Sequence, residues 1–105
     1  MIYLITYDKG NILKDYTPLK NAIKGCSIAW WHHMDNTWII RSNLNANEIY
    51  NELHHHIVQA DKIIIIEVTD NYQGWLNEQA WVWIRNQFDK ENPPNNFNPN
   101  PGLIY

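Results

Sequence analysis

Ile2-Tyr3-Leu4-Ile5-Thr6-Tyr7, at the start of the chain, is the stretch that decides the fold. It is rich in β-branched and aromatic residues, which predicts a first β-strand. Both alternating sets of side chains in it are largely apolar, and the same double pattern returns in residues 62–68. A strand with one wet face would alternate apolar and polar residues more cleanly. We therefore expect both faces of the sheet to be covered.

The segment after this strand predicts a helix over residues 17–25. Thr17 is expected to cap it, and Pro18 suits the first helical position because its missing N–H is not needed there. Gly25 is expected to take the left-handed conformation that ends many helices.

A hairpin and a second helix are predicted next. Residues 27–33 and 37–41 read as two strands joined by a turn at residues 34–36. Asn45 and Glu48 have the spacing of a capping box, which predicts the start of a helix. The apolar residues of this helix follow at helical spacing: Ile49, Leu53, Ile57 and Val58.

A third helix and a tail complete the chain after a fourth strand at residues 62–68. Asn77 is expected to cap the helix, whose apolar residues are Ala80, Trp81, Ile84 and Phe88. From residue 92 the composition shifts to asparagine and proline, which predicts an extended tail over residues 92–105. The apolar end of this tail, Leu103-Ile104-Tyr105, predicts that it docks on the protein.

The order strand, helix, strand, strand, helix, strand predicts an α+β chain with a ferredoxin-like fold. In this fold a four-stranded antiparallel sheet carries its helices on one face. The expected domain organisation is a single ferredoxin-like domain over residues 1–91, which includes the extra C-terminal helix, and the tail at residues 92–105. The apolar second face of the sheet predicts a homodimer, since a second copy is the simplest cover. The third helix or the tail is the competing cover.

Charge and composition restrict the classes of partner. The net charge is −3 with eight Lys plus Arg, which argues against nucleic acid as a partner because backbone binding needs clustered cations. No apolar run is long enough to span a membrane and no signal peptide is apparent, so a cytoplasmic protein without a membrane partner is expected. The single cysteine, Cys26, excludes an intrachain disulfide and reads as a small buried thiol.

No resident cofactor is expected from the histidines. His54, His55 and His56 advance by a helical step each and point in diverging directions, and a structural zinc ion needs about four ligands. Glu52 has chelating spacing to two of them, but a solvated helix face is the simpler interpretation.

Residues 29–38 gather three of the six tryptophans and two of the five histidines. Neighbours on a strand face opposite ways, so Trp30 shares a face with His32, and Trp31 with His33. Indole rings offer flat apolar faces that suit a planar ligand or a protein interface. Core packing accounts for about half of the six indoles, and the others are left for a ligand or a dimer interface.

A nucleotide-like small molecule is the ligand that this chemistry fits best. Trp31 and Trp38 are the predicted stacking residues, and Trp75 is a possible lid. His33 and Asn36 are predicted to read polar groups of the ligand. If no such ligand binds, the aromatic run is better assigned to the dimer interface.

Tyr3-Leu4-Ile5-Thr6-Tyr7-Asp8 resembles the first strand of the small CRISPR-associated adaptation nuclease subunits and of the virulence-associated D toxins. Together with Trp30-Trp31-His32-His33-Met34-Asp35-Asn36-Thr37-Trp38 it resembles small proteins labelled SinR-like in bacterial and phage genomes. The resemblance covers residues 1–70 and implies a ferredoxin-like homodimer. It also implies that Asp8 is a catalytic metal ligand, paired with its copy around Mg²⁺ or Mn²⁺. The alternative is that Asp8 only starts a turn.

Three hypotheses about function follow. The first is a non-enzymatic homodimer that captures a nucleotide-like small molecule, by analogy a phage sponge for an immune signal in a defence-associated setting. The second is a metal-dependent endonuclease or toxin-like ribonuclease that uses Asp8, the only enzyme class expected here. The third is a protein-interaction module. The first is favoured, because the chain is acidic and lacks basic residues clustered beside Asp8.

Overall fold

A computed structural model describes residues 1–92 of the chain, which divide into two compact units, Met1–Thr69 and the residues from Asp70 on. The sequence predicted a single domain over residues 1–91. The elements in chain order are β1 (Ile2–Asp8), α1 (Thr17–Gly25), β2 (Ala29–Met34), β3 (Thr37–Arg41), α2 (Ala46–Leu53), the 3₁₀ turn η1 (His54–His56), β4 (Lys62–Glu67) and α3 (Glu78–Glu91).

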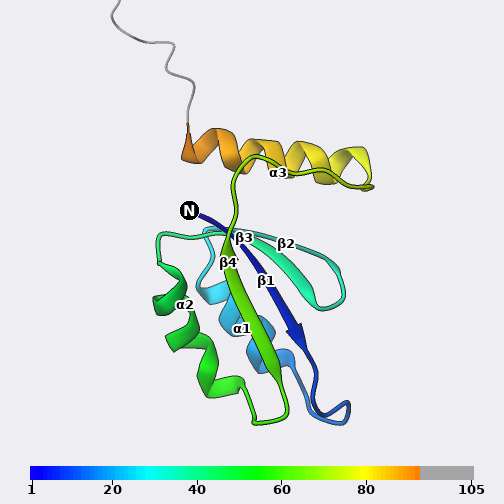
Figure 1. The fold of residues 1–105 in the computed structure, drawn as a ribbon, viewed down its shortest axis with the longest axis vertical. Coiled ribbons are helices and arrows are strands. Elements are labelled where there is room, and N and C mark those ends of the chain that lie inside the picture. The colour runs from blue at the N-terminus through cyan, green and yellow to red at the C-terminus, as the bar shows by residue number, and fades with distance from the viewer. Residues whose placement is uncertain (93–105) are drawn as a thin grey trace, which may run out of the picture. The chain divides into compact units, whose positions relative to one another are not determined.

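The first unit contains one four-stranded sheet in the order β2-β3-β1-β4 (Figure 1). Every neighbouring pair is antiparallel, and β1 lies between β3 and β4. Ile5 is opposite Trp38 on one side and Ile65 on the other. The predicted α+β class with a four-stranded antiparallel sheet is confirmed, and the arrangement is compatible with a ferredoxin-like fold.

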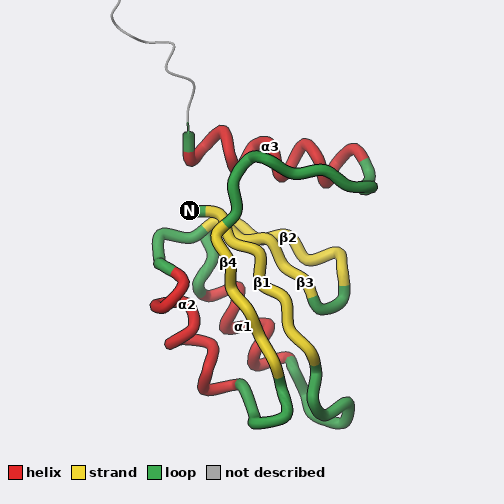
Figure 2. Tube along the Cα trace, viewed as in Figure 1, coloured by secondary structure: helices red, strands yellow, loops and turns green. Residues whose placement is uncertain are grey.

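Helices α1 and α2 cover one face of this sheet (Figure 2). The odd-numbered residues of β1, among them Ile5 at 0% exposure, point into the core with Trp38 and Ile40 of β3. Each helix contributes two fully buried aliphatic residues: Leu19 and Ile23 from α1, and Ile49 and Leu53 from α2. Burial of this apolar surface stabilises the unit by about 25 cal/mol per Å² removed from water.

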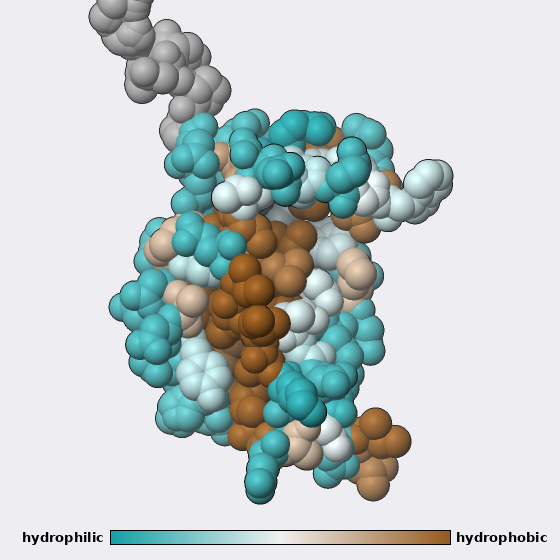
Figure 3. All heavy atoms as spheres, viewed as in Figure 1, coloured by the Kyte–Doolittle hydropathy of each residue, from teal (hydrophilic) through white to brown (hydrophobic). Residues whose placement is uncertain are grey.

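The other face of the sheet carries the even-numbered residues of β1 and β4. Ile64 is 50% exposed and Ile66 is 47% exposed, and Leu4 lies opposite Ile66 in the register. Figure 3 shows apolar residues gathered in a strip down the middle of this face. We call Leu4, Ile64 and Ile66 the open-face strip. It is the apolar second face that the sequence predicted.

Helix α1 begins and ends differently from the prediction. Thr17 is the first helical residue and not the cap, and the preceding Tyr16 makes no side-chain capping bond. The side chain of Asp15 caps the helix instead, since its Oδ1 accepts a hydrogen bond from the Thr17 N–H at 2.9 Å. Gly25 is the last helical residue and Cys26 follows in a right-handed conformation, so no left-handed glycine ends this helix. The chain passes straight from the helix toward β2.

Helix α2 begins as predicted and ends earlier. Asn45 accepts from the Glu48 N–H at 2.8 Å, and Glu48 accepts from the Asn45 N–H at 2.9 Å, which confirms the capping box. The helix stops at Leu53 and tightens into η1. Val58 was assigned to the apolar stripe but is 45% exposed, because it lies beyond the helical turn that would have carried it inward.

The second unit contains α3, which begins at the predicted cap. Asn77 Oδ1 accepts from the Ala80 N–H at 2.8 Å. The ring of Tyr72 stacks on Trp81 and on Phe88, with centroids 5.9 and 5.6 Å apart. Trp81 also donates to the Leu76 carbonyl at 3.1 Å. The predicted docking of the tail concerns residues outside the described part of the chain.

The described residues contain no helix that combines the length and apolar character needed to cross a membrane.

Gly10 lies where the loop after β1 comes closest to the loop before β4. A Cβ atom at this position would overlap the backbone carbonyl of Ala60. Backbone cannot move away as easily as a flexible side chain, so a residue with a Cβ atom does not fit at position 10 without a shift of the Ala60 backbone.

We predict that Gly10→Ala lowers the free energy of unfolding by about 1–3 kcal/mol, the usual cost of forcing extra atoms into a packed site. The matched control is Gly25→Ala, whose Cβ would meet no heavy atom within 4 Å. Alanine is the better helix former, so this control should be neutral or slightly stabilising. Urea unfolding followed by circular dichroism measures both. Equal stability of the two variants would contradict the steric argument.

Candidate functional site

The aromatic run of β2 and β3 divides between the two faces of the sheet, as its alternation predicts. Trp30 lies opposite Ile40 in the register, so it is on the helix-covered side. Trp31 lies opposite Ile39 and is on the other side. The register shifts after Trp31, where β2 has an irregularity before the hairpin turn.

Trp38 is part of the core and is not an open stacking surface. It is 0% exposed, and its Nε1 donates a long hydrogen bond of 3.5 Å to the Tyr7 hydroxyl. A ring without exposed area cannot stack on a ligand, so the structure removes Trp38 from the predicted stacking pair. Its position directly opposite Ile5 on the central strand is the physical reason.

Trp31 and His33 lie together on the side of the sheet away from α1 and α2. Their ring centroids are 5.4 Å apart and the rings are tilted by 56°. His33 is exposed, whereas Trp31 is only 6% exposed. The structure therefore brings together Trp31 and His33, which were both predicted to bind the ligand. The indole of Trp31, however, has little exposed surface on which a ligand could stack. Trp75 belongs to the second unit, where it is 98% exposed in the segment before α3.

Trp30 is more open than Trp31, and neither Trp30 nor the half-buried His32 was among the ligand-binding residues selected from the sequence. Trp30 is 43% exposed and lies against Trp38, with centroids 5.4 Å apart. His32 stacks flat on Trp38 at 3.8 Å and 7°. The Lys24 ammonium lies 4.8 Å from the Trp30 ring centroid. The alternation in the sequence already placed Trp30 and His32 on one face, but it could not show that this face is left open at the sheet edge.

Asp8 and Asn36 line one pocket of about 480 Å³ at the end of β1. The Asp8 side chain is exposed, and no described residue donates a hydrogen bond to it. Asn36 accepts the Tyr7 N–H through its backbone carbonyl at 3.1 Å, while its Oδ1 is buried without a partner. The structure therefore brings together two residues that the sequence assigned to different hypotheses. Cations also line this pocket: Lys9, Lys14 and Lys20.

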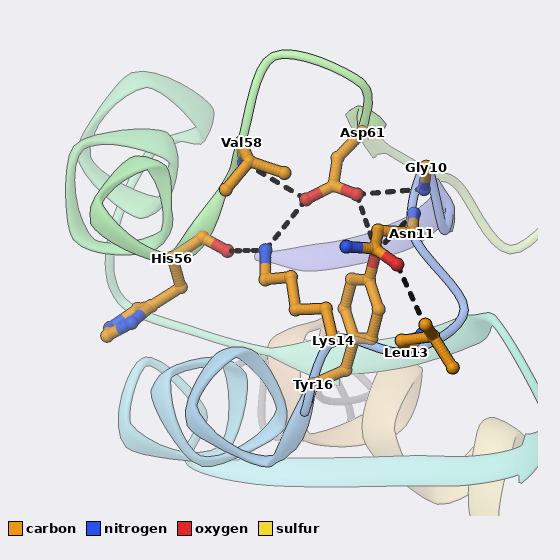
Figure 4. Close-up of polar contacts among 8 residues, drawn as sticks. All are labelled: Gly10, Asn11, Leu13, Lys14, Tyr16, His56, Val58 and Asp61. Carbon is orange, nitrogen blue, oxygen red and sulfur yellow. Dashed lines mark hydrogen bonds and ion pairs between the residues drawn. The ribbon is translucent and has the colours of Figure 1, made fainter.

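Asp61 accepts four hydrogen bonds at the same end of the sheet (Figure 4). Its Oδ1 accepts from the Gly10 N–H at 2.8 Å and from the Tyr16 hydroxyl at 2.6 Å. Its Oδ2 accepts from the Lys14 ammonium at 2.8 Å and from the Val58 N–H at 3.0 Å. In the sequence this aspartate stands directly before the strand predicted at residues 62–68 and was not selected as a site residue. Three of its four donors lie 45 or more residues earlier in the chain and leave no local signal, while the Val58 N–H is only three residues away.

The ion pair between Lys14 and Asp61 is nearly dry. The side chain of Asp61 is 1% exposed and that of Lys14 is 21% exposed. Lys14 also donates to the His56 carbonyl at 2.7 Å. Burial by itself raises the pKa of Asp61, but its four donors outweigh burial and hold that pKa well below its usual range. The carboxylate is therefore ionised at neutral pH and joins the loop after β1 to the loop before β4.

Metal-binding and nucleophilic chemistry find little support within the described residues. They contain no group of three or more His, Cys, Asp or Glu side chains that could hold a metal ion. Cys26 is buried, and burial followed by the charge of Glu52 raises the pKa of its thiol. A raised pKa lowers the thiolate fraction, which is the nucleophilic form. Cys26 is thus placed as the small buried thiol that the sequence predicted.

No protein-family model matches this chain, and no match was found among curated proteins or among solved structures. Its function has to be argued from its own residues.

We predict that Asp61→Asn lowers the free energy of unfolding by about 3–5 kcal/mol at pH 7, because it leaves the Lys14 ammonium partly buried without its counter-charge. Because the folded-state pKa is lowered, the stability that ionised Asp61 adds is present above the unfolded pKa of about 4 and is lost as the pH falls below it. The stability gap between wild type and variant should therefore narrow below about pH 4.

Urea titrations from pH 7 to pH 3 measure this gap. Asp35→Asn is the matched control: Asp35 is 79% exposed and lies 3.7 Å from Lys9, so the change should stay within about 0.5 kcal/mol. A gap for Asp61→Asn that is independent of pH would contradict the ionic explanation.

Proposed function

We propose that this protein is a non-enzymatic homodimer that captures a nucleotide-like small molecule. The observation that carries the proposal is the open aromatic edge of the sheet. Trp30 remains 43% exposed beside a fully buried Trp38, with a lysine over its ring. Large flat rings with a nearby cation match the base and the phosphate of a nucleotide.

A single small ligand fits the charge of the chain better than a nucleic acid does. The net charge is −3, and a polymer would need a continuous row of cations along its backbone. One nucleotide needs only one or two. Sequestration of a nucleotide signal, as in a phage sponge, is the role we infer by analogy.

The homodimer is supported by the open-face strip. On this face β4 presents Lys62, Ile64 and Ile66, whereas Ile63 and Ile65 pack against the core on the helix side. When two copies of this strand cross in antiparallel directions through this face, Ile64 and Ile66 of one copy meet the same residues of the other. A two-fold contact of this self-complementary kind is the usual form of a homodimer. A second copy is therefore the occupant that we assign to the strip.

The proposal is tested by native mass spectrometry and tryptophan fluorescence on the full chain. We expect a dimer at micromolar concentration. We also expect a change of fluorescence with at least one of a panel of nucleotides and cyclic nucleotides. A monomer would contradict the dimer, and no fluorescence or melting response to any nucleotide at millimolar concentration would contradict ligand capture.

We predict that Ile64→Glu makes the protein monomeric while leaving it folded. The side chain is half exposed in a single chain, so the new carboxylate is solvated in the monomer but would be buried without a partner in the dimer. The control is Ile12→Glu, because Ile12 is 87% exposed in the loop before α1. Sedimentation velocity measures the mass of each. A dimeric Ile64→Glu protein would show that the strip is not the interface.

A metal-dependent nuclease is the second candidate, favoured by the state of Asp8. A turn-forming aspartate would accept hydrogen bonds from its local backbone, but Asp8 accepts none from the described residues, and Asp61 takes the Gly10 N–H instead. The side chain is thus unengaged and exposed. Residues 1–92 contain no group of three or more His, Cys, Asp or Glu side chains that could hold Mg²⁺ or Mn²⁺, so this function requires Asp8 from a second copy.

If the nuclease hypothesis is right, Asp8→Asn abolishes Mg²⁺- or Mn²⁺-dependent cleavage of RNA or DNA without a change in unfolding. The substitution removes the charge but keeps the size of the side chain, and Asp8 makes no contact that stabilises the fold. Asp35→Asn is the control for loss of a carboxylate in the same pocket. Cleavage that survives in Asp8→Asn would eliminate Asp8 as a metal ligand. Absence of cleavage by the wild type would leave ligand capture as the function.

A further inference from the structure

His32 is held as a flat platform on the core of the sheet. Its ring lies 3.8 Å from that of Trp38 and within 7° of parallel. Trp38 is itself immobilised, at 0% exposure, among core side chains. The inner face of the imidazole is therefore fully used, and its position is fixed by a rigid neighbour.

A hydrogen bond also fixes the rotation of this ring. His32 Nε2 lies 2.8 Å from the Asp35 carbonyl oxygen in the hairpin turn. A carbonyl oxygen only accepts, so Nε2 carries the hydrogen and donates. Nδ1 is then an acceptor in the neutral ring, and no described residue donates to it. It is free to accept a hydrogen bond from a ligand.

On the helix side of the sheet, residues of the edge strand β2 remain partly exposed. Ile28 and Trp30 share the face of His32 and are 49% and 43% exposed. The buried residues of α1 are Leu19 and Ile23, which join the core under β1 and β3. The outermost strand thus extends beyond the helical layer, and its aromatic side chains keep exposed surface there.

Cations of α1 stand beside this uncovered edge. Lys24, in the last turn of α1, has its ammonium 4.8 Å from the Trp30 ring. Lys20 lies one helical turn earlier on the same face of the helix. In an acidic chain, this places positive charge next to the exposed rings.

We propose that the base of a nucleotide stacks on the outer face of His32 beside Trp30, and that its phosphate is bound by Lys24. This inference rests on the proposed capture of a nucleotide. It puts the ligand on the helix side of the sheet edge, and not at Trp31 and His33 on the other face. Trp38 supports the platform from beneath and does not touch the ligand.

Binding is measured by isothermal titration and tryptophan fluorescence, with nucleoside monophosphates and the matching nucleosides as probes. His32→Ala should weaken binding roughly tenfold or more, the usual loss when a stacking ring is removed. His32→Phe keeps a flat ring and should retain most of the affinity. Lys24→Ala should weaken the monophosphates but not the nucleosides, because only the former carry the charge.

The neighbouring histidine separates the two faces of the sheet. Weaker binding by His33→Ala with unchanged binding by His32→Ala would place the ligand on the other face and overturn this inference while the proposed function stands. Equal losses with His32→Ala and His32→Phe would also overturn it, because stacking would then not be the contact. No binding of any probe to the wild type would overturn the proposed function together with it. His55→Ala, in the exposed turn η1, is the control for a distant histidine.

Discussion

The hydrogen bonds and the ion pair of the Asp61 carboxylate hold together the loop after β1 and the loop before β4. The carboxylate binds the loop after β1 through Gly10, Lys14 and Tyr16, and the loop before β4 through Val58. A buried charge is tolerated only when its hydrogen-bonding capacity is filled, and here four donors fill it. Because Asp61 takes the donors of this corner, the Asp8 carboxylate next to them is left exposed and unengaged. The hydrogen bonds made by Asp61 thus leave the Asp8 carboxylate available to a ligand.

The period-two alternation of the strands then separates structural rings from available ones. Trp38 lies on the central part of the helix side, opposite Ile5, and is fully buried. Trp30 shares that side but stands on the outermost strand, where its ring keeps nearly half of its surface. The same residue type is therefore core at one position and surface at the other. His32 lies between the two situations, since its ring packs on Trp38 and the residue is half-buried.

The two candidate functions use groups that meet near the hairpin turn between β2 and β3. Asp35 accepts from His32 through its backbone and pairs weakly with Lys9 through its side chain. Asn36 and Asp8 line the adjoining pocket. Ligand capture uses the rings and the cation of α1, whereas the nuclease uses only Asp8 and a second copy of the chain. The nuclease needs a second copy of the chain to complete its metal site. In the ligand-capture proposal, the second copy covers the open-face strip.

The sequence by itself determined the α+β class, the hairpin, the capping box of Asn45 and Glu48, and the alternation that separates Trp30 from Trp31. These follow from local signals, in which propensity, period and caps agree over a few residues. It could not tell which alternating set of β1 faces the helices, because both Ile5 and Leu4 are apolar. It also missed Asp61, three of whose four donors lie 45 or more residues earlier in the chain, and the exposed edge at Trp30 and His32. Only the tertiary structure decided these points, because burial and long-range hydrogen bonds depend on which strand is central and which helix covers it.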